Sequence, residues 1–398
     1  MLPRVKINYE NGALGQVVAM ADGCIGMLAL GAKEVASTFV LGTAYMLKKF
    51  SDLTELGVTS ENNPLLFRQV KDFYSSATTG TELWLLGLAD SVTFTTAFDK
   101  DAVSAGAKEL ILRSNGKLRG IVAFKAPASD YSPKLTAGID QDVFSALAKA
   151  QVLADWATED KYAPIFIMIE GYAFSGDVSK LIDLHTMKHN RCAVLIGDTV
   201  KGSKNAAIGL VAGRIASCPV QRKISRVRDG ALPAIEVFAG EKGIDVADIE
   251  SINDKGYITF RTFTGRSGYF VADDPLATAI SDDYSSLTNR RVIDKAYRIA
   301  YDVLIERLNE EIPISTDGNL TPAWCASLKG QVEQAIISQM TANGNLGNDT
   351  ADFDDGGVKC SIDFRQKVLA TSKIEVVLKI KPAGYAKYID VKLGFKTV

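Results

Sequence analysis

Strand-like and helix-like segments alternate between Pro64 and Ala216, and this order limits the possible folds more than any other feature of the chain. Short, almost wholly apolar runs occur at residues 83–88, 118–124, 165–169 and 193–196. The intervening segments 101–113, 140–158, 178–187 and 206–216 have apolar residues at helical spacing, as has the segment that Pro64 opens. Such alternation is typical of an α/β layer with a largely parallel sheet.

The pattern changes after residue 218. Glycines punctuate residues 219–283, which we interpret as a loop-rich connecting layer with short strands. Residues 287–308 then form the clearest predicted helix, with one apolar stripe and an opposite face that carries Arg291, Asp294, Lys295 and Arg298. A second helix is predicted to begin at Pro322 and to extend to about residue 341.

Both termini alternate apolar and polar residues with the period of a half-buried strand. At the C-terminal end the pattern occurs at residues 358–365 and 374–380 and again in a last strand. The apolar positions of the terminal strands are Val5, Ile7 and Tyr9 at one end and Ile389, Val391, Leu393 and Phe395 at the other. The predicted fold class is α/β (α+β overall), with an N-terminal arm (1–20), a central α/β domain (21–285) and a C-terminal α+β domain with antiparallel amphipathic strands (286–398).

An amphipathic terminal strand needs a partner, because its backbone groups and apolar face otherwise promote aggregation. The partner can be a strand of the same chain or the sheet edge of a neighbouring subunit, to which a terminal strand can cross without threading a loop. Periodicity alone favours pairing within the chain, and the second possibility stays open at this point.

Composition excludes several classes of protein. The chain has 398 residues, 47% apolar and 23% charged, which is typical of a globular protein large enough for two domains. Its formal net charge of −2 provides no bulk attraction to nucleic acid, and no apolar run approaches the ~20 residues that cross a bilayer. The first ten residues lack the apolar core of a secretory signal, so we expect folding in the cytoplasm and no membrane insertion.

Residues that could bind a metal or react with a substrate are sparse. The cysteines are odd in number and lie far apart, which is typical of buried, reduced thiols. The only histidines, His185 and His189, lie four apart in a predicted helix but lack the glutamate of an H-E-x-x-H site. No G-x-S-x-G sequence occurs, and the acidic pairs and the basic run at 214–228 are interpreted as solvated turns and faces. We therefore assign no catalytic, cofactor-binding or metal-binding residue.

The best candidate for an enzymatic site is the turn that begins at Gly197 and ends at Lys204, which follows a predicted strand and precedes a predicted helix. It has the G-x-x-x-x-G spacing of a phosphate-binding loop, but Ser203 precedes Lys204 and Asn205 follows it, which is the wrong order for phosphate and magnesium ligands. A strand-to-helix turn is the favoured interpretation. An α/β enzyme that binds a phosphorylated ligand here is the alternative hypothesis.

The second half of the chain resembles the contractile tail sheath proteins of bacteriophages and phage-like injection systems. The resemblance begins with a glycine-punctuated strand pair that leads into an arginine-rich helix. The matching residues are Gly256, Phe260, Arg261, Gly265, Gly268, Tyr269, Asp283, Tyr284, Asn289, Arg291, Val292, Asp294, Lys295 and Arg298. The segment from Gly209 to Pro219 and the strands K-I-E-V-V-L-K-I-K-P and I-D-V-K-L-G-F are similar to other sheath segments.

This resemblance implies a structural subunit and not an enzyme. Sheath subunits form a six-fold helical cylinder of stacked hexameric rings around an inner tail tube, and they contract to drive the tube through a cell envelope. The expected partners are other copies of the chain, the tube protein, and baseplate and tail terminator proteins, in a virion tail or injection particle assembled in the host cytoplasm. Another structural tail or baseplate protein is a further alternative.

Residue roles also follow from the resemblance. Members of the sheath family exchange terminal strands between neighbours, which makes the two terminal strands of this chain the expected subunit-linking strands. The charged face of residues 287–308 is a second candidate for contacts with a neighbour or with the tube.

Overall fold

The structure is a computed structural model that describes residues 22–393 except 104, 350 and 353–354. A six-stranded sheet forms the centre of the described region, in the order β2-β3-β1-β4-β7-β9. Its strands are β1 (Ile25–Leu30), β2 (Ala44–Leu47), β3 (Leu83–Leu88), β4 (Gly120–Lys125), β7 (Phe166–Glu170) and β9 (Cys192–Leu195). All are parallel to their neighbours except β2, which pairs antiparallel with β3. The predicted α/β layer is confirmed.

Helices cover both faces of this sheet, which explains why its central strands are almost continuously apolar. They are α1 (Phe50–Glu55), α2 (Pro64–Ser76), α3 (Phe94–Ala97), α4 (Ala107–Arg113), α5 (Gln141–Glu159) and α6 (Ile208–Ser217). Helices α2 and α6 pack unusually close together: a Cβ added to Gly209 would lie 2.0 Å from the carbonyl oxygen of Gln69. The strand order together with the right-handed rule for parallel crossovers assigns α4 and α5 to the opposite face.

A layer of short elements connects the sheet to the C-terminal domain, as predicted for residues 219–283. It contains β10 (Phe238–Ala239), β11 (Lys242–Gly243), α7 (Ile249–Asp254), β12 (Phe260–Phe263), β13 (Arg266–Val271) and β14 (Ala277–Thr278). Strand β14 pairs with β8 (Lys188–His189), and β5 (Leu135–Thr136) pairs with β6 (Ile139–Asp140) elsewhere in the fold.

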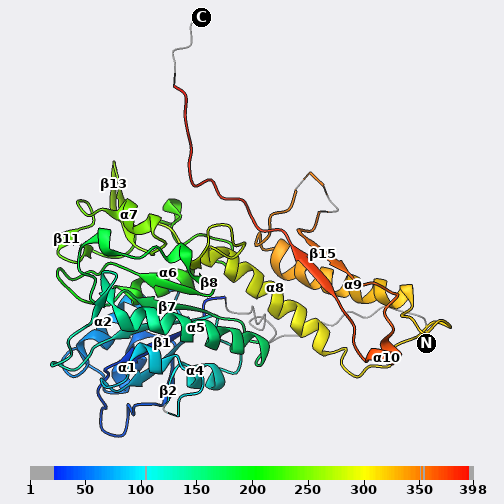
Figure 1. Ribbon diagram of the computed structural model, residues 1–398, viewed down its shortest axis with the longest axis horizontal. Coiled ribbons are helices and arrows are strands. Elements are labelled where there is room, and N and C mark those ends of the chain that lie inside the picture. Colours follow the sequence, from blue (N-terminus) through cyan, green and yellow to red (C-terminus); the bar gives the residue numbers. More distant parts are fainter. Residues whose placement is uncertain (1–21, 104, 350, 353–354, 394–398) are drawn as a thin grey trace, which may run out of the picture.

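The C-terminal domain is a helical hairpin with a small antiparallel sheet on one side (Figure 1). Its elements are α8 (Leu287–Ile305), α9 (Pro322–Ile336) with a π-helical extension (Ile337–Thr341), β15 (Val358–Ser361), α10 (Val368–Thr371) and β16 (Val377–Ile380). Both long helices begin where predicted, because Ser286 caps α8 and Pro322 occupies the first turn of α9. Leu328 and Val332 of α9 pack with Cys360 of β15 in one apolar cluster.

Two predicted helices differ from the structure. Residues 178–187 form two 3₁₀ turns, Val178–Lys180 and Leu184–Thr186, because the side chains of Asp177 and Asp183 accept hydrogen bonds from nearby backbone amides and compete with a continuous helix. His189 lies in β8, so the two histidines do not share a helical face. The helix predicted at 101–113 begins only at Ala107.

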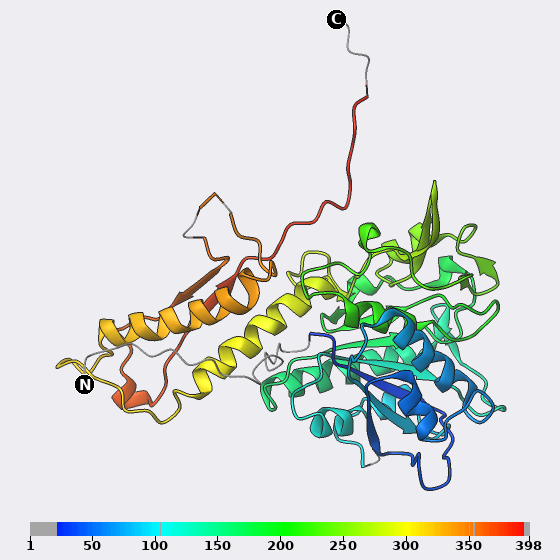
Figure 2. The ribbon, with the colours of Figure 1, turned by 180° about the vertical axis from the view of Figure 1, so that it is seen from behind.

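The last predicted strand takes no part in any sheet of the described residues. After β16 the chain continues as residues 382–393, here called the C-terminal arm, which crosses the 219–283 layer and then projects away from the body (Figures 1 and 2). Val5, Ile7, Tyr9 and Phe395 lie outside the residues that the structure describes.

Candidate site for subunit linkage

The outer half of the C-terminal arm exposes apolar side chains that nothing in the described structure covers. The side chains of Ile389, Val391 and Leu393 are 79, 77 and 96% exposed, and Tyr388 is 87% exposed. They alternate with Asp390 and Lys392, so this segment has the amphipathic pattern of a strand but does not belong to a sheet of the described residues. An extended segment of this kind is a strand that lacks its partner.

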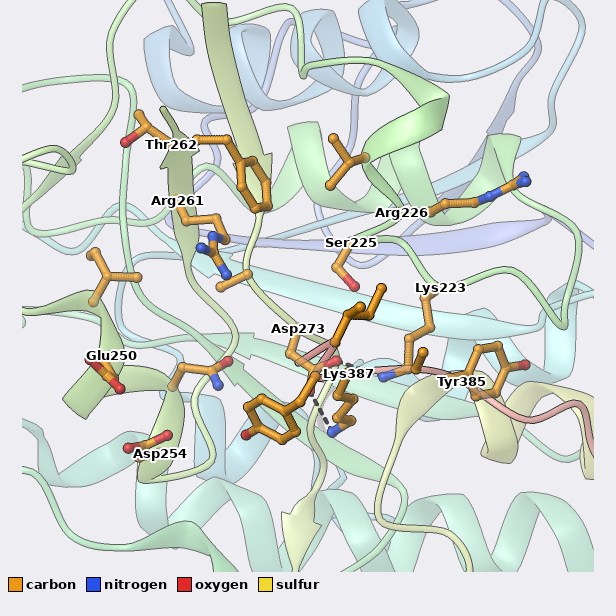
Figure 3. Close-up of a pocket in the computed structure, with 18 of the residues that line it drawn as sticks. Lys223, Ser225, Arg226, Glu250, Asp254, Arg261, Thr262, Asp273, Tyr385 and Lys387 are labelled. Atoms are coloured by element: carbon orange, nitrogen blue, oxygen red, sulfur yellow. Dashed lines mark hydrogen bonds and ion pairs between the residues drawn. The ribbon is translucent and has the colours of Figure 1, made fainter. Parts of the chain in front are cut away.

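The inner half of the arm is held against the body by a short set of contacts, here called the anchor (Figure 3). The hydroxyl of Tyr385 donates a hydrogen bond of 2.6 Å to the backbone oxygen of Gln221. The ammonium of Lys387 lies 2.6 Å from a carboxylate oxygen of Asp273. These contacts border an open groove of about 1280 Å³ between the arm and the 219–283 layer.

Asp273 belongs to a partly buried ion cluster beneath the arm. The Lys223 ammonium lies 2.6 Å from carboxylate oxygens of both Asp273 and Asp274. Burial alone would lower the pKa of Lys223, but the two carboxylates raise it above its ordinary value. Burial would raise the pKa of Asp273, but Lys223 and Lys387 hold that pKa far below its usual range, so the Asp273 carboxylate stays charged at neutral pH.

The cluster connects the arm to the start of α8. Asp274 is fully buried, and its carboxylate accepts hydrogen bonds from the backbone amide of Thr288, at 2.9 Å, and from the Thr288 hydroxyl. A carboxylate at this position complements the positive end of the helix dipole. The inner half of the arm thus contacts Asp273, and the adjacent Asp274 is hydrogen-bonded to the first turn of α8.

Replacing Lys387 with alanine is expected to loosen the arm and to leave the fold intact. The Lys387 side chain is 54% exposed, so loss of its ion pair should change the free energy of unfolding by less than about 1 kcal/mol. Chymotrypsin cleavage after Tyr385 and Tyr388 should become several-fold faster, as measured by mass spectrometry. Lys392→Ala, which removes an arm lysine outside the anchor, is the control, and equal cleavage of the two variants would contradict this role of the anchor.

The charged face of α8 points into the molecule, which corrects the expectation that it is open to a neighbour or to the tube. Arg291, Asp294, Lys295 and Arg298 are 4, 3, 9 and 8% exposed. Helix α8 lies across the ends of the central strands, and its polar face packs against those ends. The four side chains therefore make their contacts within the chain. These residues form the joint between the two domains.

Each of the four side chains has a partner in the joint. Asp294 lies 3.1 Å from Arg191 and 3.0 Å from Arg290. Arg291 donates to the backbone oxygens of Ile215 and Cys218, and Arg298 donates to that of Pro164. Lys295 contacts Asp22 at 2.7 Å and Asn345 at 2.9 Å. Burial lowers the pKa of Arg291 and of Arg298, which are held by backbone carbonyls.

The turn from Gly197 to Lys204 uses its polar groups internally. The backbone amide of Ala206, two residues before α6, donates to the Glu170 side chain at 3.0 Å, and the amide of Gly209, in the first turn of α6, donates to the Gln69 side chain at 2.7 Å. The Gln69 side-chain oxygen thus occupies a backbone amide of the first turn of α6, the kind of group that would bind a phosphate. Burial raises the pKa of Glu170 to about 8, although hydrogen bonds from the backbone amides of Ala206 and Lys125 favour its charged form.

The other candidate groups form no metal site among the residues that the structure describes. All five cysteines are free and buried. Among the described residues no group of three or more His, Cys, Asp and Glu side chains is arranged to hold a metal ion. No helix in that part of the chain is long and apolar enough to span a membrane.

Sequence reasoning missed the anchor. Lys223 was assigned to a solvated basic run, and Asp273 and Asp274 to a solvated acidic pair. The residues that meet lie 50 and 114 positions apart, and no local pattern links them. The only signal was the presence of opposite charges in three segments that are distant in the sequence.

Comparison with solved structures places this fold among the contractile sheath proteins. The helical sheath of the anti-feeding prophage in its contracted state is 15% identical, with a TM-score of 0.64 over 99% of each chain. The contracted sheath of the extracellular contractile injection system PVC is 15% identical, with a TM-score of 0.61 over 99% of this chain and 97% of that one. A sheath tail protein from Desulfitobacterium hafniense is 10% identical, with a TM-score of 0.50 over 96% of this chain and all of that one.

Family comparison gives a more specific assignment. The DUF2586 N-terminal domain matches residues 2–275, and the DUF2586 C-terminal domain matches residues 283–398. The chain therefore belongs to the DUF2586 family. No curated protein sequence matches it significantly. The fold expected from the sheath-like motifs is confirmed.

Proposed function

We propose that this chain is the structural subunit of a contractile tail sheath, which polymerises as a six-fold helical cylinder around an inner tube. Contraction of the cylinder drives the tube through a cell envelope. The observation that carries the proposal is the C-terminal arm: a sheath-type fold carries an amphipathic segment that has no partner strand among the described residues of its own subunit. The similar chains include one from the six-fold symmetrised baseplate of the anti-feeding prophage, which supports the symmetry.

The arm supplies a physical reason for self-assembly. Each apolar side chain of the size of Ile389, Val391 or Leu393 contributes ~1.5–3 kcal/mol when it is buried. In the free subunit these side chains face water, so docking of the arm on a neighbour gains this energy for every link. The N-terminal residues Val5, Ile7 and Tyr9 are proposed as a second linking strand on the same grounds of alternation.

An extended, anchored arm is suited to a lattice that rearranges without separating. The proposed link between subunits is the arm itself, an extended segment that can bend. The anchor holds the base of the arm on the rigid 219–283 layer. Subunits can then rotate against each other while the connection persists, and the energy is released by better contacts between subunits. The proposed partners are other copies of the chain, a tube protein, and baseplate and tail terminator proteins.

Negative-stain microscopy of the purified protein tests the proposal. Wide hollow cylinders are expected for the unmodified chain, and the same cylinders are expected for Lys392→Ala, which keeps the apolar face of the arm. Val391→Asp places a charge on that face and should prevent polymerisation while the circular dichroism spectrum stays unchanged. Closed rings or monomers of the unmodified chain at every salt and protein concentration would contradict the sheath assignment.

A further inference from the structure

Asn345 lies between the places where the two terminal arms join the body, and we propose that it positions them relative to each other, so that a displacement at one arm changes the mobility of the other. Its side chain belongs to a continuous line of hydrogen bonds, here called the relay, that connects Asp22 with Tyr385 of the anchor. The inference rests on the proposed function only for its consequence in assembly, since that function uses both arms as links.

The relay begins where the chain enters the joint between the domains. Asp22 is the first residue that the structure describes, two positions after the end of the predicted N-terminal arm. Its carboxylate lies 2.7 Å from the ammonium of Lys295 on α8, and both side chains are largely buried. Among the described residues Lys295 forms an ion pair with no other carboxylate. The N-terminal side of the chain is therefore held on α8 by this one ion pair.

Asn345 connects Lys295 to the segment that follows α6. It is 2% exposed and follows the π-helical extension of α9. Its side-chain oxygen accepts from Lys295 at 2.9 Å, and its side-chain nitrogen donates to the side-chain oxygen of Gln221 at 2.8 Å and to the backbone oxygen of Asn343 at 3.2 Å. An ammonium can only donate, so the amide oxygen must face it. Turning the amide would leave buried polar atoms unpaired, which holds Asn345 in one orientation.

Gln221 completes the relay to the C-terminal arm. Its side chain accepts from Asn345, and its backbone oxygen accepts from the hydroxyl of Tyr385 at 2.6 Å. One residue thus contacts both the buried amide and the anchor. The relay spans five segments that are distant in the sequence, and every step is a direct hydrogen bond or ion pair.

The turn that contains Asn345 also contacts the start of the C-terminal arm directly. The backbone amide of Gly347 donates to the backbone oxygen of Lys381 at 2.9 Å. A Cβ added to Gly347 would lie 2.5 Å from the backbone oxygen of Pro382, so the two backbones are in close contact. A shift of this turn therefore displaces the arm at its first residues and at Tyr385 together.

Apolar packing keeps the middle of the relay rigid. Val220, which precedes Gln221, and Leu346, which follows Asn345, are both buried. They belong to one apolar cluster that also contains Ile299 of α8. Close-packed interiors have little free volume, so a displaced member moves its neighbours. A shift at one end of the relay is expected to reach the other end for this reason.

Helix α8 supports both arms on one face. Thr288, in its first turn, is hydrogen-bonded to Asp274 of the ion cluster beneath the C-terminal arm. Lys295, which holds Asp22, lies seven residues further along the helix. Seven residues are about two helical turns, so the two contacts lie on the same side of α8 and roughly 10 Å apart along its axis.

Coupling between the arms would make assembly cooperative. A neighbour that immobilises one arm would also fix the anchor of the other, and the effect is reciprocal because it is a coupling free energy between two sites. A subunit that is already linked through one arm would then present its second arm in a fixed direction. Two independently hinged arms would give no such advantage.

Chymotrypsin cleavage after Tyr385 tests the relay in the full chain. All variants carry Val391→Asp in addition, so that polymerisation does not protect the arm. Asp22→Ala removes the carboxylate at the far end of the relay. A buried cation without its counter-ion gains by turning to solvent, so the Lys295 ammonium should release Asn345. Release of residues 386–398, measured by mass spectrometry, is expected to become at least about five times faster, the lower end of typical coupling between two sites.

A double-mutant cycle identifies Asn345 as the connection. Asn345→Ala interrupts the relay in its middle and should accelerate the same cleavage by a similar factor. Adding Asp22→Ala to Asn345→Ala should then have no further effect, because the path is already broken. Asp22→Asn keeps an acceptor for Lys295 and should give a smaller increase than Asp22→Ala, which provides a second measurement if the alanine variant folds poorly.

Two controls separate positioning from general loosening. Asn343→Ala removes an exposed asparagine side chain of the same turn that bonds only the backbone oxygen of Gln339 among the described residues, and it should leave the cleavage rate unchanged. Val332→Ala weakens a buried apolar cluster outside the relay and should lower the free energy of unfolding in urea without accelerating cleavage.

Unchanged cleavage of Asp22→Ala, or a double variant whose increase is the product of the two single increases, would overturn the relay. Cleavage of Val332→Ala as fast as that of Asn345→Ala would overturn it too, because general destabilisation would then account for the effect. The sheath assignment is judged separately on the chain with native Val391. Cylinders together with uncoupled cleavage would overturn the relay alone, whereas coupled cleavage in a chain that never forms cylinders would support the relay and contradict the sheath.

Discussion

A chain that lacks residues 388–398 is expected to fold normally and to remain monomeric. The described residues of this segment make no contact that stabilises the subunit: Tyr388, Ile389, Val391 and Leu393 are between 77 and 96% exposed. Their removal should change the free energy of unfolding by less than about 0.5 kcal/mol, as for substitutions outside any packed region. Polymerisation should be abolished, because the proposed linking strand is lost.

Urea denaturation and negative-stain microscopy measure the two expected effects separately. The anchor residues Tyr385 and Lys387 stay in the truncated chain, so its body keeps all of its described contacts. The full chain with Lys392→Ala is the control for assembly. Loss of folding in the truncated chain would mean that the arm pairs within its own subunit, and undiminished cylinders would mean that it links nothing.

Replacement of Asp294 with alanine is expected to produce the largest loss of stability. Asp294 is 3% exposed and is the carboxylate between Arg191 and Arg290, which are 6 and 7% exposed. Removing it leaves two buried guanidinium groups without their common counter-ion. Breaking a buried ion pair by deleting one partner typically costs about 3–5 kcal/mol, because the remaining charge is uncompensated.

Urea unfolding of Asp294→Ala and Asp294→Asn measures this effect. Asparagine keeps the size of the side chain and one acceptor oxygen, so its cost should be intermediate. Lys373→Ala disrupts the ion pair with Glu375, whose side chains are 68 and 69% exposed, and should cost less than about 1 kcal/mol. A loss below about 1 kcal/mol for Asp294→Ala would show that the joint does not depend on this charge.

The joint and the arm have different tasks in the proposed sheath. Buried, charged contacts along α8 hold the two domains in one arrangement, so the subunit can transmit force as a solid body. The arm makes few contacts beyond its anchor, so it can follow a neighbour during a rearrangement. The stable element and the adaptable element are thus built from different parts of one chain.

Local patterns predicted most of the secondary structure correctly. The apolar runs became β3, β4, β7 and β9 within a few residues of their predicted ends, because a strand buried on both faces must be almost wholly apolar. Helix α8 begins at Leu287 as predicted, since Ser286 caps it. The prediction at 178–187 was wrong, because aspartate side chains bonded the local backbone in place of a helix.

The charged face of α8 shows what periodicity cannot decide. The polar face of a helix usually meets solvent. Arg291 and Arg298 instead donate hydrogen bonds to backbone oxygens, and no local sequence pattern identified these acceptors. They belong to Ile215, Cys218 and Pro164. Those acceptors lie at or near the ends of elements far away in the chain. Only folding brings them to the helix.

The sequence alone determined the α/β order, the two long C-terminal helices and the amphipathic character of the arm, because each depends on residues that are close along the chain. Tertiary structure decided which charges are buried, how Asp273 and Lys387 anchor the arm, and that the arm finds no partner strand among the described residues of its own subunit. These features depend on contacts between distant segments, and a one-dimensional pattern carries no information about distance in space.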